Sequence, residues 1–366
     1  MQLLHSPQIS TAAIPDSLQT ALDDIVNQVQ IHSHFCISHP SYKSLELPPE
    51  VVTRFQNLPL NLQTKLLTQR LSTFLYGLYY NASLKLALAN DSNTSDLALN
   101  QNLENDTYLG VDLTFYDRLH ESNTTEGYFN PSWQVIKQET DGALAVQQGG
   151  LTLHINPAKH LQPDVQNPSI GDVVAIKMPK NLVQNGFYMA VGNAGPCKSE
   201  DVVRVYFNLT PAGAVAIMRS LTTQLNNISV PFKFKALYNP KDYGRYDSAV
   251  LYFNKNNYQA VHSVLQKVYV EHQSDFQPEV PLFTKQLAPG LAIAEEPNQK
   301  FAQKESFGTN RCQIVAKGLL EAWAKGDNSP SVRLAEILQQ FSLLQIELQR
   351  PYLNANSEDI YTVLEL

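Results

Sequence analysis

The stretch Val202-Val-Arg-Val-Tyr-Phe-Asn-Leu-Thr-Pro211 decides the fold, because two structural patterns meet in it. Its first seven residues alternate with a period of two, which predicts a β-strand. Thr210-Pro211 then supplies a helix N-cap and a first-turn proline. The sequence therefore predicts a strand that leads directly into a helix.

Further elements extend this pattern on the C-terminal side. Apolar residues recur at spacings of three and four through residues 211–228, which predicts a helix with one apolar face. Residues 230–237 alternate again, and a turn at Asn239-Pro240 leads to a predicted strand over 248–253. We interpret this order as a β-α-β crossover followed by another strand.

The rest of the chain divides into segments that differ in composition and in the spacing of apolar residues. Residues 1–90 contain apolar stripes at helical spacing and predict a helical N-terminal region. Residues 91–106 are rich in Asp, Ser, Asn and Thr and predict a linker or long loop. Residues 107–366 predict one domain in which a mixed β-sheet packs against helices, so the expected fold class is α+β.

Composition limits the classes of protein that fit. The chain has 366 residues, 43% of them hydrophobic, and a formal net charge of −7, which argues against disorder and against nucleic-acid binding over a broad basic face. The three cysteines are far apart and fit reduced thiols. No signal peptide or membrane-spanning stretch is evident. We therefore expect a cytoplasmic protein without membrane or nucleic-acid partners.

The predicted strands place polar side chains on one surface. Residues two apart in a strand share a face, so Arg204, Tyr206 and Asn208 point one way, as do Lys233 and Lys235 in the second strand. Because the crossover helix covers one face of the sheet, we expect both polar sets to lie together on the other face.

The local charge leaves two interpretations of this surface open. Residues 202–260 contain seven Lys or Arg and two acidic residues, which is +5 within a chain of −7. Alternating lysines are typical of a solvated face, whereas tyrosine and asparagine interleaved with arginine favour a bound anion. Arg311 lies in the first turn of a helix predicted to begin near residues 306–308, where backbone N–H groups favour anions, or it is a simple surface arginine. His32, His34, Cys36 and His39 have no second cluster at suitable spacing, so no metal site is predicted.

Several stretches between residues 107 and 325 resemble the Hop-A family of type III secretion effectors, which also occurs as lyase proteins beside ribosomal peptide precursors. The stretches that resemble the family are Gly186-Phe-Tyr-Met-Ala-Val-Gly192, Val203-Arg-Val-Tyr-Phe-Asn-Leu209, Pro231-Phe-Lys-Phe-Lys235, Tyr243-Gly-Arg-Tyr-Asp-Ser-Ala-Val-Leu-Tyr252, Ala288-Pro-Gly-Leu-Ala-Ile-Ala-Glu-Glu-Pro297 and Ser306-Phe-Gly308 with Arg311.

The resemblance implies an activity and roles for individual residues. Members in lanthipeptide-type and thioamitide-type pathways resemble phosphothreonine lyases, which eliminate phosphate from phosphoserine or phosphothreonine and leave a dehydroamino acid. By the same resemblance, Lys235 is the general base, Arg204 and Arg245 are phosphate ligands, Tyr252 lines the site, and Arg311 is a distal phosphate ligand.

One position departs from the pattern of the effector lyases. Where those proteins place a histidine as general acid, this sequence has Tyr206, and no histidine lies between His160 and His262. Either tyrosine donates the proton, or phosphate departs without a donor, or the protein does not catalyse elimination.

The leading hypothesis is a lyase that needs no cofactor. Its substrate would be a precursor peptide phosphorylated by a separate kinase, and Lys233 and Asn208 would complete the phosphate and substrate contacts. A lysine is a base only when neutral, a form that a neighbouring cation and partial burial both favour. The alternatives are a non-catalytic effector-like module that binds a phosphorylated protein or peptide, and an interaction protein that is indifferent to phosphate.

Overall fold

The computed structural model describes residues 14–89, 111–165 and 167–366, which form two compact units. Of the described residues, the first unit holds 14–89, 281–285 and 297–360, and the second holds the remainder. The predicted α+β class is confirmed. The predicted linker at 91–106 lies outside the described residues. No helix in the described part of the chain has the length and apolarity to cross a membrane.

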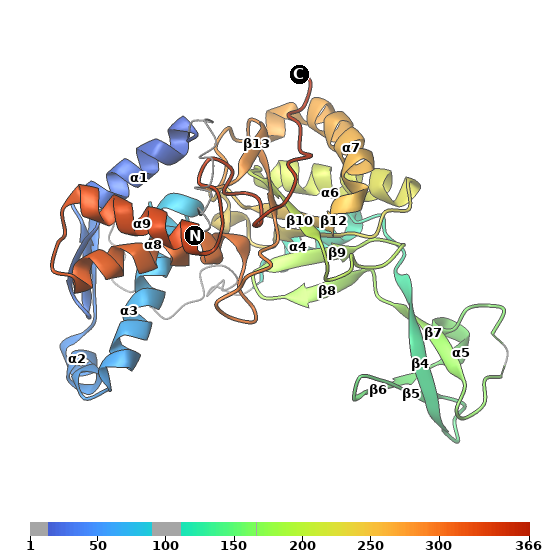
Figure 1. Ribbon diagram of the computed structural model, residues 1–366. Coiled ribbons are helices and arrows are strands. Elements are labelled where there is room, and N and C mark those ends of the chain that lie inside the picture. Colours follow the sequence, from blue (N-terminus) through green and yellow to red (C-terminus); the bar gives the residue numbers. More distant parts are fainter. Residues whose placement is uncertain (1–13, 90–110, 166) are drawn as a thin grey trace, which may run out of the picture. The chain divides into compact units, whose positions relative to one another are not determined.

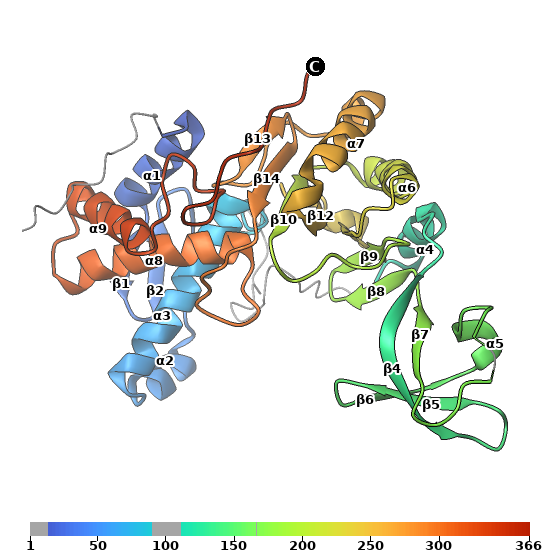
Figure 2. The ribbon, with the colours of Figure 1, turned by 45° about the vertical axis from the view of Figure 1, so that its right-hand side comes forward.

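The first unit combines helices with one small antiparallel sheet (Figure 2). Its helices are α1 (Asp16–Gln28), α2 (Pro49–Gln56), α3 (Leu60–Leu75), the π-helix η1 (Tyr76–Tyr80), α8 (Phe307–Ala324) and α9 (Pro330–Leu343). Its strands are β1 (Gln30–Ser33), β2 (Cys36–His39) and β3 (Tyr42–Glu46).

Two features of the first unit differ from the sequence prediction. The N-terminal region is not wholly helical, because residues 30–46 form the sheet β1-β2-β3. These strands have only four or five residues, which is too few for alternation to stand out beside long helical stripes. In addition, α8 and α9 group with the N-terminal segment, although the sequence placed them in one domain with the large sheet.

Helices α8 and α9 cross closely at Gly318. A Cβ atom added to this glycine would lie 2.5 Å from the Cα atom of Ile337 and 2.6 Å from its backbone nitrogen. Backbone atoms cannot rotate away as a side chain can, so only a residue without a side chain allows this approach.

We expect Gly318→Ala to lower the free energy of unfolding by about 1–3 kcal/mol, because the added methyl group forces the two helices apart. Denaturant titration followed by circular dichroism measures this change. Inside an exposed helix the same substitution would stabilise the protein by about 1 kcal/mol. A gain of that size would contradict the close crossing.

The second unit is built on a seven-stranded sheet with the order β13-β14-β10-β12-β11-β9-β8. Helices α6 and α7 lie side by side on this sheet (Figure 1). The strands are β8 (Asn181–Gln184), β9 (Phe187–Val191), β10 (Val202–Phe207), β11 (Lys233–Leu237), β12 (Ala249–Asn254), β13 (Lys285–Ala288) and β14 (Leu291–Glu295). The longer helices are α4 (Leu113–Ser122), α6 (Pro211–Asn227) and α7 (Tyr258–Glu271), and the short 3₁₀ helices are η2 (Pro240–Asp242), η3 (Lys255–Asn257) and η4 (Gln273–Asp275).

The predicted crossover exists, but its two strands are not neighbours. Strands β10 and β11 each pair antiparallel with β12, so they run parallel to one another with β12 between them. Thr210 caps α6 by accepting a hydrogen bond from the Gly213 N–H, as the sequence predicts. After the turn that follows β11, the chain returns as β12 and is inserted between β10 and β11. Local periodicity in the sequence does not predict this insertion.

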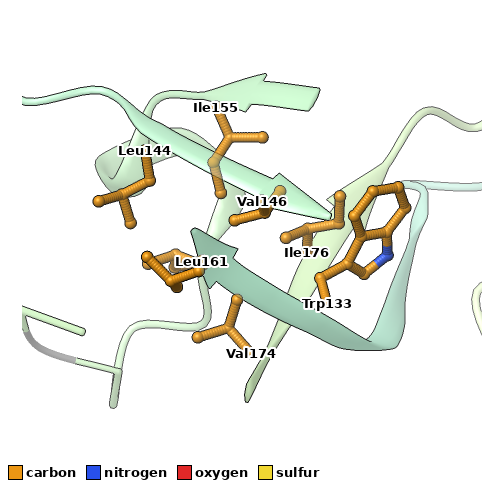
Figure 3. Close-up of a cluster of buried hydrophobic side chains, with 8 residues drawn as sticks. Trp133, Leu144, Val146, Ile155, Leu161, Val174 and Ile176 are labelled. Carbon is orange, nitrogen blue, oxygen red and sulfur yellow. The ribbon is translucent and has the colours of Figure 1, made fainter. Parts of the chain in front are cut away.

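A four-stranded antiparallel sheet with the order β6-β5-β4-β7 also belongs to the second unit. Its strands are β4 (Tyr128–Gln138), β5 (Leu144–Gln148), β6 (Leu151–Ile155) and β7 (Val173–Met178), and the short helix α5 (Pro157–His160) follows β6. The sheet has its own buried core, shown in Figure 3, which consists of Trp133, Val135, Leu144, Val146, Ile155, Leu161, Val174 and Ile176.

Polar contacts attach helix α4 to strand β9. The Tyr188 hydroxyl accepts a hydrogen bond from the Asn123 amide at 2.9 Å and lies 3.2 Å from His120 Nδ1. Lys180 donates to the His120 and Asn123 carbonyl oxygens at 2.9 and 3.0 Å. Burial, with a smaller contribution from the Lys180 ammonium group, lowers the pKa of His120.

This lowered pKa gives stability a definite dependence on pH. Unfolded histidine has a pKa of about 6.5, so the contribution of His120 is present above that pH and is lost as the pH falls through its lower folded value. We expect the melting temperature to decrease between pH 7.5 and pH 5, and His120→Asn to reduce this decrease. His154→Asn, at an exposed histidine of β6, is the control. An equal decrease in wild type and His120→Asn would contradict this role.

Candidate functional site

The register of the central strands places polar side chains opposite one another on one face of the sheet. Arg204 of β10 pairs with Tyr252 of β12, which pairs with Lys233 of β11. Residues that lie directly opposite each other in antiparallel strands project from the same face. Tyr252 therefore lies between the two cations, at the same level along the strands.

A second set of paired residues lies two residues further along β10 on the same face of the sheet. Tyr206 of β10 pairs with Val250 of β12, which pairs with Lys235 of β11. The Cα atoms of Tyr206 and Lys235 are therefore about 10 Å apart, two strand spacings. The structure thus brings together four side chains that the sequence placed on one surface, with β12 between the pairs.

Lys235 is buried between two aromatic rings. The residue is only 4% exposed, and its Nζ lies 4.0 Å from the ring centroid of Phe187 and 5.8 Å from that of Tyr252. Within the described ranges, neither Lys235 nor Lys233 forms a hydrogen bond or ion pair through its ammonium group. A buried ammonium group without an acceptor is costly, so this position suits a bound anion.

Arg204 reaches the same ring from the other side. Its Cζ lies 5.2 Å from the centroid of Tyr252, and its Nε donates a hydrogen bond to Glu296 Oε2. Glu296 directly follows strand β14, in the turn Glu295-Glu296-Pro297, and this turn supplies a carboxylate to the same face of the sheet.

Arg245 completes the series at the Phe187 ring. Its Cζ lies 5.8 Å from the centroid of Phe187, and its guanidinium forms two hydrogen bonds to Asp247 of 2.6 and 2.9 Å. Burial raises the pKa of the nearby Asp242 carboxyl, and the Arg245 guanidinium opposes this effect. Both arginines therefore have carboxylate partners, whereas the lysines do not have them within the described residues.

We call the resulting series the cation–aromatic row, which consists of Arg204, Tyr252, Lys235, Phe187 and Arg245. Lys233 also contacts the Tyr252 ring, with its Nζ 5.6 Å from the centroid. Four cations and the three carboxylates Glu296, Asp247 and Asp242 leave a formal net charge of +1 around the row. The row can therefore attract an anion and enclose it between apolar ring surfaces.

Two candidate residues have other roles in the structure. Asn208 follows the last residue of β10, is 2% exposed, and donates from its side-chain amide to the Glu279 carbonyl oxygen at 3.0 Å. It therefore fixes the end of the strand.

Arg311 belongs to the first unit and lies in the second turn of α8. It is 1% exposed, and its guanidinium donates to the carbonyl oxygens of Pro351 and Leu353 at 2.7 and 2.9 Å. The predicted helix start is present, since Ser306 caps α8. The Arg311 guanidinium is bonded to the carbonyl oxygens of the C-terminal loop, and the Asn208 amide is bonded to the Glu279 carbonyl oxygen. Neither residue is therefore included in the proposed site.

We expect Arg311→Met to destabilise the protein by about 2–4 kcal/mol, because it leaves buried carbonyl oxygens without donors. Its affinity for inorganic phosphate should stay at the wild-type level. Thermal denaturation and calorimetric titration measure the two quantities, with exposed Arg54→Met as the control. Lost phosphate affinity with unchanged stability would restore Arg311 as a ligand.

Sequence reasoning missed two residues that shape this site, and it did not predict the partner of a third. Phe187 lies in one of the stretches that resemble the Hop-A family, but its apolar side chain indicated only core. Asp247 lies two residues after Arg245, a spacing that allows the ion pair without demanding it. Glu296 is 92 residues from Arg204 in sequence, and only the pairing of β14 with β10 brings them together.

Comparison with known proteins identifies the family of this region. Residues 178–353 match the model of the HopA1 effector protein family. Two solved structures of effector proteins are similar, one from Pseudomonas syringae pv. tomato strain DC3000 (18% identity, TM-score 0.41, 69% of this chain and 86% of that chain) and one from Pseudomonas syringae pv. syringae strain 61 (13% identity, TM-score 0.40, 67% and 81%). No curated protein matches the sequence. The predicted resemblance to this family is confirmed for the matched residues.

Proposed function

We propose that this chain, whose residues 178–353 match the model of the HopA1 effector protein family, is a lyase that eliminates phosphate from phosphothreonine or phosphoserine in a peptide. The observation that supports this most directly is Lys235, which is buried at the centre of the cation–aromatic row without a counter-ion in the described residues. A base that must reach a Cα proton beside a phosphate needs this position, close to cations yet not paired with a carboxylate.

The proposed reaction is a β-elimination. The neutral amine of Lys235 takes the Cα proton, the electrons of that bond form the Cα–Cβ double bond, and the Cβ–O bond breaks. Phosphate leaves with the bonding electrons, and Arg204 and Arg245 stabilise its charge. The products are a dehydroamino acid in the peptide and free phosphate, so the chemistry balances without a metal or organic cofactor.

Tyr206 is the proposed partner of the leaving oxygen. It shares the face with Lys235 across β12, with a Cα separation of about 10 Å, and it is buried like Lys235, at 2% exposure. Its hydroxyl would donate a hydrogen bond or a proton to the bridging oxygen. The substrate would be a precursor peptide that a separate kinase has phosphorylated, and Lys233 would widen the positive surface that attracts it.

A non-catalytic module that binds a phosphorylated protein or peptide is the second candidate. The observation that favours it is the pairing of both arginines with carboxylates, which fixes the two guanidinium groups in position on the sheet. Such a module would bind the peptide without changing its mass.

Mass spectrometry after incubation with a phosphothreonine peptide tests the first proposal. We expect wild type to remove the mass of phosphoric acid and to give a product that reacts with thiols. Lys235→Met keeps the length of the side chain without its amine, so we expect elimination to slow by about 10²–10⁴-fold. Peptide affinity should change by less than about tenfold, because the arginines remain.

Lys267→Met, at an exposed lysine of α7 in the same unit, is the matched control and should retain full activity. Tight binding by wild type with no change in peptide mass would establish the second candidate instead. Equal loss of binding and elimination in Lys235→Met would make Lys235 a ligand and not the base.

A further inference from the structure

Two consecutive glutamates at the end of β14 extend to opposite faces of the sheet. Glu296 pairs with Arg204 on the face of the cation–aromatic row. Glu295 is 3% exposed, and its Oε1 accepts hydrogen bonds from Lys255 Nζ at 2.7 Å and from the Tyr361 hydroxyl at 2.9 Å. Alternation along a strand explains why adjacent side chains separate in this way.

The backbone around these glutamates is firmly held. Glu295 pairs with Val203, and the Glu296 N–H donates to the Val202 carbonyl oxygen at 2.8 Å, which extends the pairing of β14 with β10 by one residue. The Cα of Glu296 is therefore fixed relative to the strand that bears Arg204.

The segment that bears Tyr361 is held as well. The Thr362 N–H donates to the Tyr258 hydroxyl at 2.8 Å, and the Leu364 N–H donates to the Leu287 carbonyl oxygen at 2.9 Å. The Tyr258 and Tyr361 rings meet edge to face, with centroids 4.9 Å apart. Tyr361 thus reaches Glu295 from a segment that is bonded both to α7 and to strand β13.

We infer that Glu296 is a positioning residue that orients the Arg204 guanidinium over Tyr252, and that Lys255 and Tyr361 fix Glu296 through its neighbour Glu295. A carboxylate at Nε fixes the plane of a guanidinium group, because the donors of arginine have a rigid geometry. This inference rests on the proposed function for its substrate and names additional residues that prepare the same site.

Removal of Glu296 would have two opposing effects on phosphate binding. The site would become more positive, which favours phosphate binding. The Arg204 side chain would also become free to adopt other conformers, and holding it in place again would cost up to about 2 kcal/mol of entropy, which opposes phosphate binding. A carboxylate that competes with phosphate must be able to move away when phosphate arrives. The Glu296 side chain is only 19% exposed and is paired with Arg204 Nε from a fixed backbone, so we expect orientation to outweigh competition.

Titration of the full chain with inorganic phosphate tests the inference without requiring catalysis. We expect Glu296→Ala to weaken phosphate binding by about tenfold. Glu296→Gln retains an oxygen that can accept from Nε, so it should restore most of the affinity. Tyr361→Phe should weaken binding in the same direction by about threefold, because it loosens Glu295. Glu200→Gln, at an exposed glutamate, is the control and should match wild type.

With a phosphopeptide that is turned over, Glu296→Ala should raise KM about tenfold and change kcat much less, provided that it melts at the wild-type temperature. Tighter phosphate binding by Glu296→Ala, or unchanged binding, would overturn the positioning role. Absence of elimination by wild type would overturn the proposed function alone, because the phosphate titration still reports on Arg204.

Discussion

The insertion of β12 between β10 and β11 is the constraint from which the rest of the site follows. If β10 and β11 were adjacent, Arg204 and Lys233 would lie about 5 Å apart, and their like charges would repel. The inserted strand places the Tyr252 ring between them instead, and the ring attracts each cation through its π face. An aromatic residue at this position therefore lets a small area of sheet hold several cations without a carboxylate for each.

The cations of the site differ in how they are held. Arg204 and Arg245 each have a carboxylate partner that fixes the guanidinium plane, and Lys235 packs against two aromatic rings without a carboxylate partner in the described residues. Fixed groups stabilise developing charge well because they need not reorganise during the reaction. A base must instead accept a proton, and a carboxylate on Lys235 would favour its charged form. The distribution of partners thus matches the distribution of proposed roles.

Periodicity predicted the elements of this region and the face that they share, but not their order in the sheet. The alternation in residues 202–208 and 230–237 and the cap at Thr210 depend on local sequence, and all three appear in the structure. The partners of Arg204 and Arg311 depend on contacts between segments that lie 92 and about 40 residues apart, which no local pattern encodes. The three-stranded sheet at 30–46 was missed because its strands are too short to show a period.

The tyrosine in place of a histidine is compatible with elimination for a physical reason. A proton donor matters most when the leaving group carries a charge that nothing else stabilises. Phosphate monoesters have a second pKa of about 6, so near neutral pH part of the substrate already bears a proton on its phosphate. In the proposed reaction, the two held arginines and Lys233 would stabilise the departing anion, which would reduce what a donor must contribute. A hydrogen bond from Tyr206, a residue type whose reference pKa is about 10, would then be sufficient without full proton transfer. The proposed elimination would therefore depend more on the base, and on the orientation of the arginines around it, than on an acid.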